Sequence, residues 1–112
     1  MYNQVSALAT YAGQLKFDAE DNPKWAMMDV NLGSPDEPLY VQAFIKQPDI
    51  IWEMKQYLID YNINRKIWFE GSIECDAGNM VIYIRKLLLL EKFYTRQELE
   101  RYKRGSVDFS DD

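Results

Sequence analysis

The chain of 112 residues contains no histidine and a single cysteine, Cys75. One cysteine excludes an internal disulfide. Without histidine, the usual zinc sites and the Cys-His and Ser-His pairs of nucleophilic enzymes are also excluded. Any catalysis would have to use carboxylates, lysine or tyrosine. We interpret Cys75 as a small hydrophobic residue at an inward-facing strand position, and we predict no enzyme activity, no metal site and no cofactor.

The chain also lacks a long apolar run. A membrane-spanning helix needs about 20 predominantly apolar residues. The four consecutive leucines at 87–90 are flanked by charged residues on both sides. The first five residues, Met-Tyr-Asn-Gln-Val, show neither the charged nor the apolar region of a signal peptide. We therefore expect a cytoplasmic protein with no membrane contact.

Positive charge is scarce for a protein that binds nucleic acid. The 13 Lys and Arg residues are outnumbered by 18 Asp and Glu residues, which gives a formal net charge of −5. Nucleic-acid-binding domains usually carry a basic surface. Asp108, Asp111 and Asp112 lie in the last seven residues, and without these three carboxylates the net charge is −2. The acidic balance counts against nucleic acid as a partner, but its concentration at the C-terminus weakens the objection.

Apolar and aromatic residues are abundant, at 47% and 14% of the chain, which predicts a single packed domain. Five segments are typical of strands: 4–17, 24–32, 39–46, 66–75 and 80–90. We expect Gly13 to bend the first of them. Residues 49–62 have the spacing of an amphipathic helix, and residues 76–79 have the composition of a hairpin turn.

A short helix is expected near the C-terminus. Thr95 followed three residues later by Glu98 is the capping-box pattern that begins a helix, and Gly105 is suited to end it. Residues 95–104 carry four basic residues. This helix either binds phosphates or a partner through them, or it is a solvated terminal helix that packs Leu99 and Tyr102 on the barrel.

The order of three strands, one helix and two strands is typical of the OB-fold, a five-stranded Greek-key β-barrel. We therefore predict a mainly β protein with an OB-fold domain in residues 1–93. A C-terminal helix in 94–105 and a flexible acidic tail in 106–112 complete the predicted organisation.

Aromatic and aliphatic residues take opposite parities in the predicted strands. Successive side chains of a strand point to opposite faces, so the aliphatic residues are expected in a core and the aromatic residues on the outer surface. The outward aromatic residues are Trp25, Tyr40, Phe44, Trp68 and Tyr83. The basic residues near them along the strands are Lys16, Lys24, Lys46 and Arg85.

This set of residues has two interpretations. Bases stack on aromatic rings with a gain of about 1–3 kcal/mol each, and lysine and arginine neutralise phosphates, so the set fits a platform for single-stranded nucleic acid. Alternatively, some of the rings cover the core and others form an oligomer interface, where Trp and Tyr are enriched. The choice between platform and interface stays open at this point.

Carboxylates accompany one of these aromatic residues. Glu70, Glu74 and Asp76 share the outward parity of Trp68. A carboxylate row can form an acid–base or metal site, but nothing supplies a further partner, and we interpret the row as a solvated face. Because carboxylates repel phosphate, we expect nucleic acid to follow the first three strands, over Trp25, Tyr40 and Phe44, and away from Trp68.

Two stretches of sequence resemble the bacterial single-stranded DNA-binding protein family. Leu39-Tyr-Val-Gln-Ala-Phe-Ile, a helix, and Lys66-Ile-Trp-Phe-Glu-Gly-Ser-Ile-Glu resemble the third strand, helix and fourth strand of that family. Asn79-Met-Val-Ile-Tyr-Ile-Arg-Lys-Leu-Leu-Leu-Leu resembles its last strand, and Val107-Asp-Phe-Ser-Asp-Asp is similar to its acidic tip. The basic N-terminal signature of the family is poorly matched by residues 2–12, and its long linker is replaced by a short helix.

The resemblance implies non-catalytic binding of single-stranded DNA, or of RNA, in DNA replication, recombination or repair. It also implies a homodimer or higher homo-oligomer, and a protein partner that recognises the acidic tail. The alternative is an OB-fold assembly module whose outer aromatic residues contact other subunits.

Overall fold

The computed structural model describes residues 4–103. Its strands are β1 (Gln4–Tyr11), β2 (Lys16–Phe17), β3 (Ala26–Asn31), β4 (Tyr40–Ile45), β5 (Lys66–Asp76) and β6 (Asn79–Leu89). Its helices are α1 (Pro48–Tyr57), the 3₁₀ helix η1 (Asp60–Asn62) and α2 (Arg96–Lys103). The predicted acidic tail, 106–112, lies outside the described residues.

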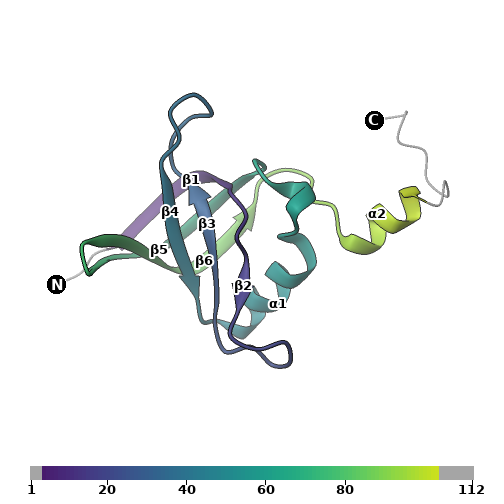
Figure 1. Ribbon diagram of the computed structural model, residues 1–112, viewed down its shortest axis with the longest axis horizontal. Helices are drawn as coiled ribbons and strands as arrows, with labels where there is room; N and C mark the ends of the chain where they lie inside the picture. Colours follow the sequence, from purple (N-terminus) through teal and green to yellow (C-terminus); the bar gives the residue numbers. More distant parts are fainter. Residues whose placement is uncertain (1–3, 104–112) are drawn as a thin grey trace.

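The strands form one sheet in the order β1-β5-β6-β4-β3-β2, and an additional pairing of β1 with β3 closes it into a barrel (Figure 1). The β4–β6 pair is parallel, whereas the other pairs are antiparallel. α1 follows β4 and precedes β5 in the chain. This arrangement is the predicted OB-fold.

The first predicted strand is divided by a sharp bend. Gly13 and Gln14 both adopt positive φ, at 86° and 58°, a region that glycine occupies without steric cost. Before the bend, β1 pairs with β5; at Thr10 and Tyr11 it also pairs with β3, and β2 continues along β3. The bend at Gly13 therefore leads the chain from β1, which pairs mainly with β5, to β2, which pairs with β3. The single strand expected over 4–17 is thus two strands.

Most aliphatic residues of inward parity fill the barrel interior, as predicted, but Leu39 and Met80, of inward parity, are exposed, and Val81, of outward parity, is buried. The most deeply buried strand residues include Met28, Val30, Ala43, Ile45, Ile67, Phe69, Ile82 and Ile84. Ile51 and Met54 of α1 join the same cluster, so the helix packs on the barrel. Burying a side chain of this size contributes about 1.5–3 kcal/mol, which is why the alternation determines which face turns inward.

A bulge interrupts the β5–β6 pairing between Glu70 and Gly71. Lys86 lies opposite Glu70, and Ile84 lies opposite Gly71, so Arg85 has no partner residue in the ladder. A Cβ at Gly71 would collide with the backbone carbonyl of Tyr83. Glycine at this position therefore permits the close approach of the two strands that the bulge requires.

The interior position predicted for Cys75 is wrong, because Cys75 is exposed. Met80, opposite it in the ladder, is exposed as well. Within residues 4–103, the pairing of β1 with β5 extends to Ser72, and the pairing of β4 with β6 extends to Val81. The end of the β5–β6 hairpin therefore extends beyond the barrel, where inward parity no longer means burial.

The helix predicted over 49–62 is shorter than expected. α1 ends at Tyr57, and Leu58 leaves the helical region with φ −90° and ψ 63°. The side chain of Asn62 donates to the carbonyl oxygen of Tyr57 at 2.6 Å, so a carbonyl group left free by the helix end is satisfied from η1. Two short helical elements replace the single helix.

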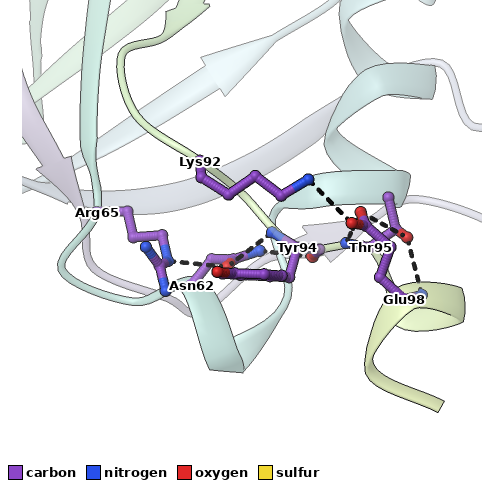
Figure 2. Close-up of polar contacts among 6 residues, drawn as sticks. All are labelled: Asn62, Arg65, Lys92, Tyr94, Thr95 and Glu98. Atoms are coloured by element: carbon purple, nitrogen blue, oxygen red, sulfur yellow. Dashed lines mark hydrogen bonds and ion pairs between the residues drawn. The ribbon is translucent and has the colours of Figure 1, made fainter. Parts of the chain in front are cut away.

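Asn62 is fully buried and joins three segments of the chain. Figure 2 shows its contacts with Arg65 and Tyr94. In addition to the Tyr57 bond, its Nδ2 donates to the carbonyl oxygen of Tyr94 at 2.9 Å. Its Oδ1 accepts the Tyr94 N–H at 3.2 Å and the Arg65 Nε–H at 3.0 Å. The Arg65 guanidinium also lies 5.1 Å from the Tyr94 ring centre. Asn62 thus anchors the segment that leads from β6 to α2.

α2 begins with the predicted capping box. The Glu98 N–H donates to Thr95 Oγ1, and the Thr95 N–H donates to Glu98 Oε1 (Figure 2). Lys92 Nζ lies 2.9 Å from Glu98 Oε2; this hydrogen bond, with that from the Thr95 N–H, lowers the pKa of Glu98. No residue of α2 is buried, and the helix lies beside the barrel (Figure 1). Tyr102 packs on Tyr94 rather than in the core.

Within residues 4–103, no helix is long and apolar enough to cross a membrane. The same part of the chain contains no group of three or more Cys, Asp or Glu side chains that could hold a metal ion.

Asn62→Ala should lower the free energy of unfolding by about 2–4 kcal/mol, because it leaves buried backbone groups of Tyr57 and Tyr94 unpaired. Urea unfolding measures the change. Gln56→Ala is the matched control: it removes an exposed side-chain amide from α1, and we expect a change within about 0.5 kcal/mol. Equal effects of the two substitutions would contradict the anchoring role of Asn62.

Tyr11→Phe should reduce stability at neutral pH by about 1 kcal/mol, because the buried Tyr11 hydroxyl donates to the carbonyl oxygen of Leu58 at 2.9 Å. Burial, reinforced by the negative charge of Asp60, raises the pKa of Tyr11 from 10.0 to about 12. The unfolded state therefore loses its proton first, and the wild type loses stability as the pH rises from about 10 to about 12.

The Phe variant lacks this titration, so its stability deficit should shrink across the same pH interval. Denaturant unfolding of both proteins at several alkaline pH values measures the difference. A deficit that stays constant would contradict the assigned pKa.

Candidate nucleic-acid interface

Three of the predicted outward aromatic residues form a continuous row across the outer surface. The Trp25 and Phe44 ring centres are 6.0 Å apart, and the Phe44 and Tyr83 ring centres are 5.8 Å apart with an interplanar angle of 25°. Phe44 of β4 lies directly opposite Tyr83 of β6, and Trp25 immediately precedes β3. We call Trp25, Phe44 and Tyr83 the aromatic row.

All three members are partly exposed. Their exposed ring surface is therefore available to a planar ligand, while the ring contacts restrict the motion of each side chain.

A polar turn holds Trp25 in place. Asp18 Oδ1 accepts the backbone N–H groups of Lys24 at 2.8 Å and of Trp25 at 3.2 Å, and the Asp18 N–H donates to the Trp25 carbonyl oxygen at 3.4 Å. Desolvation opposes ionisation of Asp18, but the hydrogen bonds from Trp25 and Lys24 outweigh it and lower the pKa of the carboxyl group. Asp18 is therefore ionised at neutral pH and positions the first ring of the row.

Basic groups border the aromatic row on the side of β2 and β4. Lys46 Nζ lies 5.9 Å from the centre of the Tyr83 ring. Lys16 of β2 is exposed and lies opposite Met27, which in turn lies opposite Phe44. Lys24 is exposed and adjacent to Trp25 in the chain. These three predicted lysines accompany the row.

Arg85, the fourth basic residue predicted for the site, differs from the three lysines because it lies beside a carboxylate. It is the unpaired residue of the β6 bulge, and its guanidinium lies 3.9 Å from Glu70 Oε1. The Glu70 carboxylate therefore partly offsets the charge of Arg85. Both side chains are partly exposed, so the pair is weak.

Tyr40 and Trp68, which the sequence groups with the other aromatic residues, lie elsewhere. Tyr40 is at the opposite end of β4 from the aromatic row, directly opposite Asn31, and is 63% exposed. Trp68 of β5 lies between Leu8 of β1 and Leu88 of β6. Of the five predicted aromatic residues, the structure thus brings three together and separates two.

Sequence reasoning did not assign Met27 to the site, although Met27 has the outward parity of its strand. It lies between Lys16 and Phe44 and extends the row towards β2 as a partly exposed apolar surface. Asp29, two residues along the same face, adds a negative charge opposite Gln42. The outer face therefore carries aromatic rings and lysines at the Trp25 end of β3, next to the Asp18 carboxylate, and one further carboxylate at Asp29.

No protein-family model matches the chain, and no curated protein matches it by sequence. Solved structures do match. Mitochondrial single-stranded DNA-binding protein Rim1 from S. cerevisiae superposes with a TM-score of 0.64 at 7% identity, over 82% of this chain and 98% of that chain. The small single-stranded DNA-binding protein of Streptomyces coelicolor gives a TM-score of 0.61 at 7% identity, over 80% and 94% of the two chains.

A third similar structure is the dimeric N-terminal domain of PriB from Thermoanaerobacter tencongensis. Its TM-score is 0.55 at 12% identity, and the match covers 80% of this chain and 98% of that chain. At these identities the likeness concerns the backbone fold. The chain therefore has the OB-fold of single-stranded DNA-binding proteins, as the sequence resemblance implies.

Proposed function

We propose that the protein binds single-stranded DNA on the aromatic row and performs no chemistry on it. The observation that carries the proposal is the unbroken series of ring contacts from Trp25 through Phe44 to Tyr83, with Lys46 beside the last ring. Aromatic rings on a barrel surface offer stacking faces to successive bases without regard to sequence. The similar structures include proteins named for binding single-stranded DNA, which supports the proposal.

In this mechanism, one base stacks on each accessible ring face, and the intervening phosphates lie near Lys16, Lys24 and Lys46. Each stacked base contributes about 1–3 kcal/mol, whereas the lysines add attraction that salt screens. Stacking faces do not distinguish deoxyribose from ribose, so RNA is a second ligand of the same site. The phosphate path follows β2, β3 and β4 and ends at Tyr83 of β6, because the ladder partner of Tyr83, Ser72, lies between Glu70 and Glu74 on β5.

The net charge of −5 limits the electrostatic share of the affinity. Three lysines at the row predict a slope of about −2 for the logarithm of the binding constant against the logarithm of salt concentration, from about −0.7 per neutralised phosphate on single strands. Stacking therefore supplies most of the binding energy. This balance fits a protein that holds short stretches of single strand.

We also propose that the protein associates with itself as a homodimer or larger homo-oligomer. The match to a PriB domain solved as a dimer supports this partner, and so does the exposed apolar surface around Trp68, which lies outside the aromatic row. The assembly module and the single-strand binder are therefore two surfaces of one protein rather than exclusive alternatives. Recruitment of a further protein by the acidic tail remains a prediction from the sequence.

Phe44→Leu should weaken binding of oligo-dT by about 5- to 150-fold, because it keeps apolar volume and removes a stacking face worth about 1–3 kcal/mol. Quenching of Trp25 fluorescence measures the affinity in a background in which Trp52 and Trp68 are replaced by Phe.

The matched control is Tyr40→Leu, which removes a ring from the far end of β4. It should change the affinity less than Phe44→Leu does. A larger loss from Tyr40→Leu, or no quenching of Trp25 by oligo-dT at low salt, would contradict binding on the row.

Lys46→Gln should reduce the steepness of the salt dependence by about 0.7, the contribution of one phosphate contact. Titrations with oligo-dT at several salt concentrations measure the slope. Lys103→Gln on α2 is the control and should leave the slope unchanged, since Lys103 lies on the C-terminal helix. Equal reductions in both variants would point to general charge attraction instead of a defined path.

A further inference from the structure

A small pocket lies between helix α1 and the turn that precedes β3, at one end of the barrel (Figure 1). Its volume is about 370 Å³, near the lower end of the range for ligand pockets, which suits a single planar group. The Trp52 side chain is 66% exposed, so its indole ring is accessible from solvent. We call this cavity the Trp52 pocket. The residues that line it are Asn22, Pro23, Pro48, Ile51, Trp52 and Lys55.

The Trp52 pocket adjoins the Trp25 end of the aromatic row. Pro23 precedes Trp25 by two residues, and two residues of extended chain span at most about 7 Å. On the other wall, Pro48 follows Lys46 by two residues. The β3–β4 ladder begins between these walls, at the residue after Trp25 and the residue before Lys46. A strand that stacks on the aromatic row therefore has the pocket directly beyond Trp25.

Lys55 joins the two walls of the Trp52 pocket. Its Nζ donates to the backbone carbonyl oxygen of Glu20 at 2.8 Å and lies 5.4 Å from the centre of the Phe17 ring. Because Glu20 belongs to the turn and Lys55 to α1, this hydrogen bond holds the helix against the turn. An ammonium group has three donors, and Lys55 forms no ion pair within residues 4–103, so N–H groups remain for an acceptor on a ligand.

Charges of both signs surround the Trp52 pocket. Four carboxylates and three ammonium groups lie within two residues of its lining along the chain, so the surroundings offer no net attraction for phosphate. The lining itself is mostly apolar and includes one indole ring and two proline rings. The pocket therefore suits the uncharged, planar part of a nucleotide, which is the base. The charged residues are Glu20, Asp21, Lys24, Lys46, Asp49, Glu53 and Lys55.

We propose that the Trp52 pocket is a further base-binding position, in which one base of the strand held by the aromatic row stacks on the Trp52 ring. The inference rests on the proposed binding of single-stranded DNA, and it extends the bound strand from the barrel onto α1. A single exposed aromatic residue is ordinary, but Trp52 lines a pocket that adjoins the proposed site. Stacking on a ring is independent of base identity, so the position has no sequence preference.

Proteins with one tryptophan test the position directly. Trp25→Phe combined with Trp68→Phe leaves Trp52 as the only tryptophan, and Trp52→Phe combined with Trp68→Phe leaves Trp25. Oligo-dT of about 12 nucleotides is long enough to extend beyond the aromatic row. It should quench Trp52 fluorescence over the same concentration range in which it quenches Trp25.

Trp52→Leu tests the contribution to affinity. It should weaken binding of oligo-dT of about 12 nucleotides at least about fivefold, because one stacking face is lost. Binding of oligo-dT of about three nucleotides should change much less, since the aromatic row still offers its rings. The salt dependence should stay unchanged, because no positive charge is removed. Fluorescence anisotropy of labelled oligonucleotides measures these quantities.

Tyr61→Leu is the matched control. It removes a ring that is 53% exposed on η1, the element that follows α1, and Tyr61 does not line the Trp52 pocket. It should leave the affinity for both oligonucleotides close to that of the wild type. Circular dichroism checks that each variant is folded.

The outcomes separate this position from the aromatic row. Quenching of Trp25 without quenching of Trp52 overturns the Trp52 position and leaves the aromatic row in place, whereas quenching of neither overturns the proposed function itself. Equal losses for the short and the long oligonucleotide in Trp52→Leu, or no loss for the long one, would contradict a position beyond the row. A response of Trp52 to an oligoproline peptide and not to oligo-dT would assign the pocket to a proline-rich partner instead.

Discussion

The parallel pairing of β4 with β6 is the constraint on which both the barrel and its outer surface depend. It joins the segment before α1 to the last strand, and it places Ala43 opposite Ile82 inside and Phe44 opposite Tyr83 outside. Gly71 makes the neighbouring bulge sterically feasible, since a side chain there would strike the Tyr83 carbonyl. The register that closes the core thus also brings the central rings of the aromatic row together.

Much of this arrangement could be predicted from sequence because it depends on local pattern. Strict alternation identified the inward aliphatic residues, and Thr95 with Glu98 identified the start of α2. Prediction from local pattern failed where contacts with other segments determine whether a residue is buried or where a helix ends. Cys75 has inward parity but lies near the end of the β5–β6 hairpin, where its ladder partner Met80 is exposed as well. α1 ends at Tyr57, and the Tyr57 carbonyl oxygen accepts a hydrogen bond from Asn62, which lies outside the helix.

The candidate site, too, was predicted only in part from the local pattern of the sequence. Parity correctly placed Trp25, Phe44 and Tyr83 on the outer face, yet it could not tell that Trp68 stands between two exposed leucines, because cross-strand register is not encoded in one strand alone. The sequence left open whether the outward aromatic residues form a nucleic-acid platform or a subunit interface. In the structure these residues lie on separate parts of the barrel surface, so the two roles can belong to different parts. In the proposed function, one surface holds a single strand and a separate surface holds a second copy.

Ultraviolet crosslinking of oligo-dT to the wild-type protein, followed by mapping of the modified peptides, tests the central claim most directly. Stacking on the aromatic row predicts crosslinks at Trp25, Phe44 and Tyr83. It also predicts none at Trp68, which lies between Leu8 and Leu88, apart from the aromatic row. Crosslinks concentrated at Trp68, or none above the level given by an unrelated acidic protein, would contradict the account.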